Sequence, residues 1–352
     1  MYYTETSGSY YEMGRLLGEA HQLKIGAMLD FLAGPFRCWT AAEFRRARTR
    51  LMAGTERRYP EIIEEIQGIA DGSGFTLQQI YTMNFYCLIN RPVMGCTDIV
   101  FPDTDDGPLL SKTNDMPVCE GKHAGVRLLR PTGGISILGG AFPGTCWIEP
   151  GMNEAGLAIG AASCSAETPV SEDVFSPHLL GRRILSKCEN VPDALALLGT
   201  IPLGRWGMNL ALVDRQGRAA VVEKSGRIQG VRTAAPKKPV YCTDHSCLTK
   251  EMQPYCGGKT AGASNPRYQT IRRMLRGRTT TRALLKKIVA YNQPPGALSR
   301  YGGEDPQKYE TEFVAIFRVR SLQAEFCFSH PDRDPWREFS LRPGRKGGRA
   351  AV

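Results

Sequence analysis

The spacing of apolar residues changes at Gly95-Cys96, and this change constrains the fold of the 352-residue chain more than any other feature. Before it, apolar residues recur at helical spacing, and the first such run is Met13, Leu16, Leu17 and Ala20. After it, short runs of alternating apolar and polar residues predominate, which is typical of strands. We therefore expect a helical leader followed by a strand-rich body.

The expected elements fall into groups. In the leader, 9–31 reads as a helix, capping boxes begin at Thr40 and Thr76, and Pro60 begins a further helix. Strands are expected at 97–101, 108–113, 126–130, 135–138, 157–161, 209–213, 219–223, 313–319 and 324–329. Helices are expected at 177–189, 192–199, 267–277 and 280–291. Because strands and helices are grouped, the pattern favours an α+β fold with antiparallel sheets and helices outside.

Composition indicates a globular protein, with 42% hydrophobic and 23% charged residues. No apolar run approaches the length of a membrane span, so no membrane partner is expected. Residues 1–5 lack a basic stretch followed by an apolar one, and we expect no signal peptide. Eleven cysteines, an odd number, without such a signal favour free thiols and a cytoplasmic location.

The net charge of +10 is partly concentrated in two places. The basic residues concerned are Arg45, Arg46, Arg48, Arg50, Arg57 and Arg58 in one helix, and Arg342, Arg345, Lys346 and Arg349 in the last segment. A nucleic-acid-binding protein is one hypothesis for this charge. No groove-reading or base-stacking motif accompanies it, so a solvated helix face and a loose tail are favoured, without a nucleic-acid partner.

Cys96 combines a preceding glycine with a strand start, and its expected partner strand leads to Asn114-Asp115. If the peptide bond before Cys96 breaks, the new α-amine can act as base for the thiol. Two other interpretations remain. Cys96 can be a small buried apolar residue, as most free cysteines are, or the nucleophile of an unprocessed thiol hydrolase with His245 as its base.

Several motifs together resemble a known group of enzymes. Gly95-Cys96-Thr97, Asn114-Asp115 and residues 151–158 resemble the choloylglycine hydrolase and penicillin acyltransferase branches of the N-terminal nucleophile hydrolases. Residues 11–15 and 64–72 resemble the pro-segment of the acyl-coenzyme A:6-aminopenicillanic acid acyltransferase family. Choloylglycine hydrolases expose their cysteine almost at the start, so the long leader favours the acyltransferase branch. The resemblance runs from about residue 8 to about residue 341.

This resemblance implies a four-layer αββα sandwich of two antiparallel sheets between helix layers. It also implies autocatalytic cleavage of a zymogen between Gly95 and Cys96. Residues 1–95 would be the pro-segment and then the small subunit, 96–341 the catalytic domain, and 342–352 a disordered basic tail. The two fragments would remain associated as a heterodimer.

The implied activity is that of a cysteine-nucleophile enzyme. It would hydrolyse or transfer the acyl group of a small linear amide or thioester through an acyl-Cys96 intermediate. No resident cofactor is expected, and an acyl-coenzyme A is a candidate acyl donor.

The resemblance also assigns site residues. Asp115 matches the aspartate that holds the cysteine amine, Arg267 the arginine beside the nucleophile, and the Ser163 backbone amide one oxyanion donor. Asp244 stands where relatives carry the asparagine that is the second donor. An ionised carboxylate cannot donate a hydrogen bond. Either Asp244 is protonated, or it binds a cationic substrate group, or Asn209 donates instead.

The departure at Asp244 leaves a further hypothesis open, that of a catalytically silent binding or scaffold protein on the same fold. Lys112 stands where choloylglycine hydrolases use an arginine. The candidate substrate-binding residues are Lys112, Asn114, Asn209 and His245. The spacing of Cys242, His245 and Cys247 fits no standard zinc pattern, so no metal is predicted.

Overall fold

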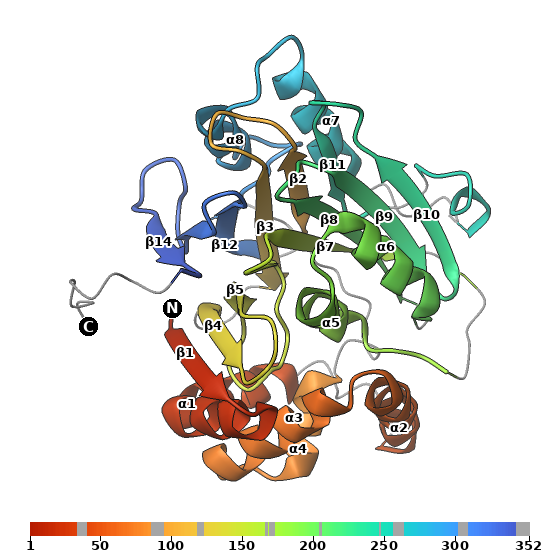
Figure 1. Ribbon diagram of the computed structural model, residues 1–352, viewed down its shortest axis with the longest axis vertical. Helices are drawn as coiled ribbons and strands as arrows, with labels where there is room; N and C mark the ends of the chain where they lie inside the picture. Colours follow the sequence, from red (N-terminus) through yellow and green to blue (C-terminus); the bar gives the residue numbers. More distant parts are fainter. Residues whose placement is uncertain are drawn as a thin grey trace.

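The protein was analysed as a computed structural model. It describes residues 1–33, 41–85, 95–117, 123–165, 168, 173–203, 206–245, 248–255, 264–301 and 309–342. Most of the proposed tail, 343–352, lies outside these residues. Figure 1 shows the leader at one end of the molecule, beneath two sheets and their covering helices.

The leader is helical, as the sequence predicts, apart from one strand. Its helices are α1 (Tyr10–Ala33), α2 (Ala41–Arg58), α3 (Pro60–Ser73) and α4 (Leu77–Asn84). The expectation missed β1 (Tyr3–Gly8), which pairs in parallel with β4 (Gly125–Pro131). The leader therefore contributes an edge strand to a sheet of the body as well as a helical cap.

Helices α1 and α3 approach each other closely because glycines line their crossing. A Cβ atom added to Gly14 would lie 2.1 Å from the carbonyl oxygen of Glu65, and one added to Gly72 would lie 2.1 Å from that of Arg15. No side chain fits in such spaces. The absence of side chains thus allows the two backbones to pack directly.

The larger sheet has eight strands in the order β1-β4-β5-β6-β7-β8-β9-β10. The strands not yet given are β5 (Ile137–Ala141), β6 (Gly151–Asn153), β7 (Leu157–Ser165), β8 (Trp206–Asp214), β9 (Ala219–Ser225) and β10 (Ile228–Thr233). Every pairing after β1–β4 is antiparallel.

The smaller sheet has six strands and is antiparallel throughout. Its order is β11 (Val240–Thr243), β2 (Thr97–Phe101), β3 (Leu109–Pro117), β12 (Tyr309–Arg318), β13 (Gln323–Cys327) and β14 (Arg337–Ser340). Strand β2, which follows Cys96 directly, lies between β11 and β3. The nucleophile candidate therefore lies at the start of an interior strand rather than of an edge strand.

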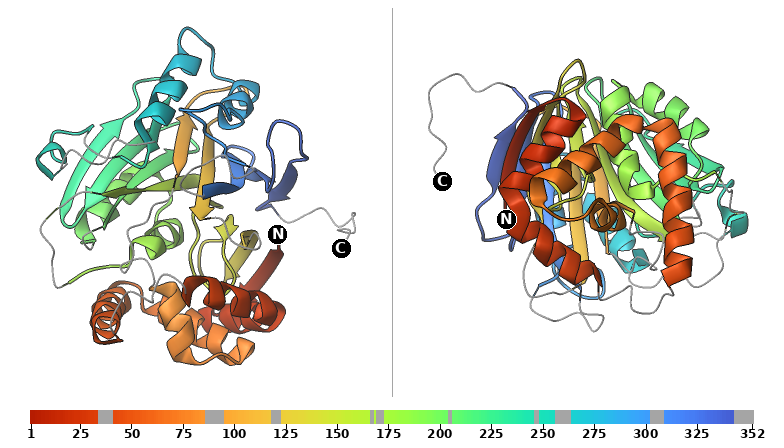
Figure 2. Two further views of the ribbon diagram at one scale, coloured as in Figure 1. Left: turned by 180° about the vertical axis from the view of Figure 1, so that it is seen from behind. Right: turned by 90° about the horizontal axis from the view of Figure 1, so that it is seen from below.

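The two sheets pack face to face through β2 and β3 on one side and β7 and β8 on the other. Helices α5 (Leu180–Lys187) and α6 (Val191–Thr200) cover the larger sheet, and α7 (Ser264–Leu275) and α8 (Arg282–Val289) cover the smaller one. Short 3-10 turns lie at Pro177–Leu179 and Gln253–Tyr255. Figure 2 shows this layering from two further sides. The expected α+β sandwich with four layers is confirmed.

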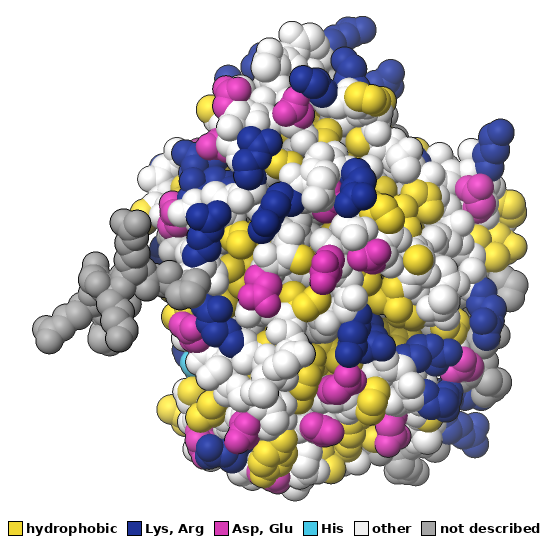
Figure 3. All heavy atoms as spheres, in the orientation of Figure 1, with side chains coloured by type: hydrophobic (Ala, Val, Ile, Leu, Met, Phe, Trp, Pro, Cys, Tyr) yellow, Lys and Arg dark blue, Asp and Glu magenta, His cyan; other side chains and the backbone are white. Residues whose placement is uncertain are grey.

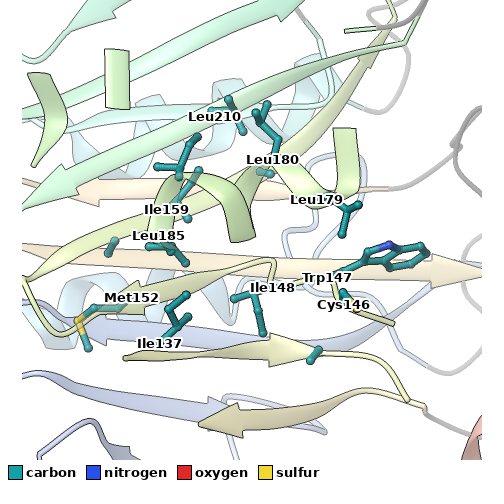
Figure 4. Packing of buried hydrophobic residues seen from close by; sticks show 14 of the residues in the cluster. Ile137, Cys146, Trp147, Ile148, Met152, Ile159, Leu179, Leu180, Leu185 and Leu210 are labelled. Carbon is teal, nitrogen blue, oxygen red and sulfur yellow. The ribbon is translucent and has the colours of Figure 1, made fainter. Parts of the chain in front are cut away.

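The main hydrophobic core lies around the larger sheet. Figure 4 shows Ile159 and Leu210 of neighbouring strands against Leu180 and Leu185 of α5. A second, smaller cluster joins the other sheet to its helices, through residues such as Ile99, Ile271, Leu285, Val314 and Ile316. These apolar layers hold the polar groups near Cys96 in fixed positions between them.

The charged surface is mixed in sign. Figure 3 shows basic side chains gathering toward the end that carries α7 and α8, with acidic ones among them. In α2, two of the arginines are engaged: Arg58 and Arg57 both bond to Asp173. Among the described residues, no helix combines the length and apolar character needed to cross a bilayer.

Candidate active site

Cys96 lies directly before β2 and is 3% exposed. The register of the sheet pairs Asp98 with Lys112 of β3 and with Cys242 of β11. Side chains alternate along a strand, so Cys96 and Asp98 share the face that meets the larger sheet. The strand positions beside Asp98 are thus taken by a cation on β3, Lys112, and by a thiol on β11, Cys242.

The backbone of Cys96 is held on both sides by Asp244 and Arg267. The Cys96 nitrogen donates to Asp244 Oδ2 at 2.8 Å and to Oδ1 at 3.0 Å. Arg267, from the first turn of α7, donates through Nη1 to the Cys96 carbonyl oxygen at 2.7 Å and to Thr97 Oγ1 at 3.1 Å. The other guanidinium nitrogen, Nη2, pairs with Asp244 Oδ2. Arg267 therefore lies beside the nucleophile candidate, where the resemblance places it.

Asp115 lies on the preceding side, against Gly95. A Cβ atom on Gly95 would lie 2.5 Å from Asp115 Oδ2. Oδ1 accepts a hydrogen bond from Thr311 Oγ1 at 2.7 Å, and Oδ2 lies 3.6 Å from Arg300 Nε. Burial raises the pKa of Asp115 to about 6, although Arg300 and Arg267 oppose the shift. In the uncut chain, the bond to the Cys96 nitrogen that the resemblance implies for Asp115 is made by Asp244.

Lys112 and Asn114 are the β3 neighbours of the thiol. Cys96 Sγ lies 3.9 Å from Asn114 Oδ1, a distance at which the S–H can donate. Burial raises the pKa of the Cys96 thiol to about 12, and the ammonium of Lys112 opposes that rise through its charge and a hydrogen bond. Lys112 is itself 1% exposed and donates to the carbonyl oxygen of Ala161. A buried cation therefore faces the sulfur.

Asn209 fixes the segment that carries Asp244. Its Nδ2 donates to the carbonyl oxygens of Thr243 and His245, each at 2.7 Å. A side-chain amide has two N–H donors, and both are used on the residues flanking Asp244. Asn209 is thus a positioning residue for Asp244 in this geometry.

His245 turns away from Asp244 and toward α7. Its Nδ1 lies 2.9 Å from Thr243 Oγ1 and 2.8 Å from Ser264 Oγ. Burial lowers the pKa of His245 below its usual value, so the ring is neutral near pH 7. These contacts link β11 to the first residue of α7, and so help to place Arg267 of the same helix.

Ser163 lies buried near the end of β7, opposite Met208 of β8. Ala161, two residues earlier on the same strand, receives the hydrogen bond from Lys112. This contact brings β7 to the side of the sheet that carries Cys96. The use of the Ser163 amide as an oxyanion donor remains a prediction.

Asp98 was not among the expected site residues. It is fully buried, its Oδ2 lies 3.9 Å from Lys112 Nζ, and Cys242 Sγ donates to Oδ2 at 3.7 Å. The sequence contained enough information to find Asp98. If the expected strands 97–101 and 108–113 form a hairpin that turns at 105–107, Asp98 pairs with Lys112, as it does in the structure.

No group of three or more histidine, cysteine or acidic side chains within the described ranges is arranged to hold a metal ion. Cys247, one member of the set weighed above, lies outside the described residues.

Comparison with known proteins provides the family. The model of the acyl-coenzyme A:6-aminopenicillanic acid acyl-transferase family matches residues 140–333, more than half of the chain. The chain belongs to this family. A search of curated proteins finds no match.

Solved structures similar to this acyl-transferase family member share little sequence with it. A mutant conjugated bile acid hydrolase from Clostridium perfringens is 10% identical, with a TM-score of 0.47, over 70% of this chain and 92% of that one. Penicillin V acylase from Agrobacterium tumefaciens is 14% identical, with a TM-score of 0.44, over 66% and 82%. A Caenorhabditis elegans ortholog of N-acylethanolamine-hydrolyzing acid amidase is 11% identical, with a TM-score of 0.43, over 64% and 93%. The family assignment rests on the family model.

Proposed function

We propose that this member of the acyl-transferase family cleaves itself between Gly95 and Cys96 and then uses Cys96 as an N-terminal nucleophile. The observation that carries the proposal is the clamp on the Cys96 backbone, in which Asp244 binds the nitrogen and Arg267 binds both Asp244 and the Cys96 carbonyl. A carboxylate placed on this nitrogen has a clear use once the nitrogen becomes an amine.

Cleavage begins with attack of the Cys96 sulfur on the Gly95 carbonyl carbon. The thiol proton passes to the Cys96 nitrogen as the C–N bond breaks, which leaves a thioester between Gly95 and the Cys96 sulfur and a free amine on Cys96. Water then hydrolyses the thioester to the Gly95 carboxylate and the Cys96 thiol. Gly95 suits this step because a side chain there would meet the Asp115 carboxylate at 2.5 Å.

In the mature enzyme, Asp244 would hold the α-amine of Cys96. An α-amine has a pKa near 8, so its neutral form can take the thiol proton and becomes an ammonium paired with the carboxylate. Of the three interpretations of Asp244, this is closest to binding of a cation, but the cation is the protein's own terminus. Asp115 would then line the space that Gly95 leaves.

Acyl transfer follows from the same arrangement. The thiolate attacks the carbonyl of a small linear amide or thioester, the amine or thiol leaves, and an acyl-Cys96 remains for water or another amine to take. Lys112 supports the thiolate by its charge. The Ser163 amide is the proposed oxyanion donor. The chemistry needs no resident cofactor, and an acyl-coenzyme A is one candidate donor.

The leader would stay bound after cleavage, because its contacts with the body are buried. Glu65 of α3 bonds to Arg182 of α5 at 2.9 Å, and both are at most 1% exposed. Asn84 Oδ1 accepts from the Cys146 nitrogen at 2.6 Å. These bonds, with the β1–β4 pairing, support a heterodimer of the two fragments. The free thiols among the described cysteines support a reducing, cytoplasmic location.

Trapping of the acyl-enzyme tests the catalytic part of this proposal. Purified protein is incubated with a panel of N-acyl amides and acyl thioesters, quenched in acid and digested. We expect the acyl mass on the peptide that begins at Cys96, and its loss on treatment with hydroxylamine. Cys96→Ala should abolish both the adduct and product release. Turnover that survives in Cys96→Ala would reject the nucleophile, and a panel without any adduct would favour a silent scaffold.

A further inference from the structure

Three side chains form a row across the smaller sheet, two residues along β2 from Cys96. Lys112 of β3, Asp98 of β2 and Cys242 of β11 are neighbours in the register. Asp98 Oδ2 lies 3.9 Å from Lys112 Nζ and accepts from Cys242 Sγ at 3.7 Å. Asp98 is 0% exposed and Lys112 1%, so this charge pair is removed from solvent.

Strand β7 of the larger sheet packs against Asp98 and Lys112. A Cβ atom on Gly160 of β7 would lie 2.0 Å from Asp98 Oδ1, so the carboxylate occupies the space of the missing side chain. The next residue, Ala161, accepts a hydrogen bond from Lys112 Nζ. Asp98 therefore has little room to turn, and Lys112 is held between Asp98, Ala161 and the sulfur of Cys96.

The electrostatics of the row depend on both partners. Burial raises the pKa of Asp98 to about 7, although Lys112 opposes the shift, and Asp244 and Glu149 add to it. Burial alone would lower the pKa of Lys112, but Asp98 and Cys96 outweigh it and hold that pKa above its usual value. Burial also keeps the Cys242 thiol protonated, with Asp98 adding to the rise in its pKa and Arg232 opposing it.

We propose that Asp98 is a positioning residue that keeps Lys112 charged and directed at the sulfur of Cys96. The inference rests on the proposed function in one respect, since it takes Cys96 as the nucleophile. A buried lysine without a counter-ion tends to lose its proton. Asp98 prevents this loss, and Lys112 in turn stabilises the thiolate.

The proposed role of Asp98 and its direct charge effect on Cys96 predict opposite shifts in the pKa of the Cys96 thiol when Asp98 is replaced by Asn. Asp98 carries the same charge as the thiolate and by itself disfavours the thiolate. If it acted only in this way, Asp98→Asn would lower the pKa of the Cys96 thiol. If it acts through Lys112, the same substitution raises that pKa, because the thiolate loses the cation beside it.

The test is the rate of Cys96 alkylation by iodoacetamide, followed on the Cys96 peptide by mass spectrometry between about pH 6 and about pH 11. We expect Asp98→Asn to lower the alkylation rate about 10-fold or more at every pH below the midpoint of the rate profile, which corresponds to an upward shift of that midpoint by about 1 pH unit or more. In a Lys112→Met background the same substitution should leave the midpoint unchanged or lower it. Asp103→Asn, at a half-exposed aspartate in the turn after β2, is the matched control and should shift nothing.

A lower or unchanged midpoint in Asp98→Asn would overturn the proposal. So would a wild-type Cys96 that stays unmodified over the whole pH range, because no thiolate would then be formed. If Asp98→Asn does not fold, Asp98→Ser removes the counter-ion with a smaller side chain and has the same expected direction. Intact masses of the same samples report cleavage separately. Cleavage without the shift would reject this inference alone, and the shift in an uncut chain would reject the self-processing step alone.

Discussion

The carboxylate of Asp244 accepts hydrogen bonds from the backbone nitrogen of Cys96 at 2.8 and 3.0 Å. Arg267 binds the same carboxylate and the carbonyl oxygen of Cys96, so one ion pair holds both polar groups of this residue. In the sequence, Asp244 was the strongest departure from the family pattern. In the structure, it is the residue most directly engaged with the backbone of Cys96.

This contact predicts that turnover depends on Asp244. Asp244→Ala removes a bond to a charged group, which is usually worth about 1.5–3 kcal/mol, and we expect kcat to fall about 10- to 100-fold. Asp244→Asn keeps an acceptor oxygen but no charge and should lie between that variant and wild type. Steady-state kinetics on fully cleaved protein measures this. If Asp115→Asn abolishes turnover while Asp244→Asn leaves it intact, the role in holding the amine returns to Asp115.

Gly95→Ala should slow self-cleavage. The added methyl group would lie 2.5 Å from Asp115 Oδ2, and that carboxylate is held by Thr311 and Arg300. The carbonyl to be attacked is therefore displaced from the thiol. Intact mass against time after synthesis follows the reaction. Gly199→Ala is the matched control, since nothing lies within 4 Å of its Cβ position, and it should cleave like wild type. Equal rates in the two variants would contradict the proposed close contact.

The unfolding free energy of the protein should depend on pH through the ionisation of Asp115. Its pKa is raised from 3.8 to about 6, so the folded state binds this proton more tightly than the unfolded state. The resulting stabilisation is complete below about pH 4 and is lost as pH rises through about 6, a change of about 3 kcal/mol. Asp115→Asn removes it. In urea unfolding, the stability of the variant relative to wild type should therefore increase as pH rises from about 4 to about 7. A difference between the two proteins that does not vary with pH would contradict the raised pKa.

The buried ion pair Glu65–Arg182 should hold the leader to the body. Glu65→Gln leaves the guanidinium of Arg182 buried without its counter-ion, and we expect a loss of about 3–5 kcal/mol in unfolding free energy. The small fragment should also dissociate more readily from the cleaved protein on size-exclusion chromatography in mild denaturant. Glu19→Gln breaks the exposed pair with Arg15 and should cost no more than about 0.5 kcal/mol. If the two substitutions have similar effects, the Glu65–Arg182 pair does not hold the leader to the body.

The fold was largely predictable because its strands and helices carry strong local patterns. The hairpin expected at 209–223 is the β8–β9 pair, and the expected helix at 267–277 corresponds to α7 at 264–275. Strand β1 was missed because its partner, β4, lies about 120 residues further along the chain. Nothing local in the run Tyr3–Gly8 indicates a parallel pairing of that range.

The sequence predicted which residues lie near Cys96 better than it predicted which of them contact one another. Arg267 was placed beside Cys96 by resemblance, and the structure places it there. The partner of the Cys96 nitrogen could not be derived, because it depends on how Asn209 of β8 fixes the turn after β11. Asp98 could have been found from the hairpin register, but its burial depends on the approach of Gly160 from the other sheet.

The most direct measurement is the intact mass of freshly purified, folded protein, combined with N-terminal sequencing of each species. Self-cleavage predicts two co-purifying fragments, one ending at Gly95 and one beginning with Cys96, and a single uncut chain in Cys96→Ala. A wild-type chain that keeps its full mass after prolonged incubation from about pH 5 to about pH 9 would contradict it.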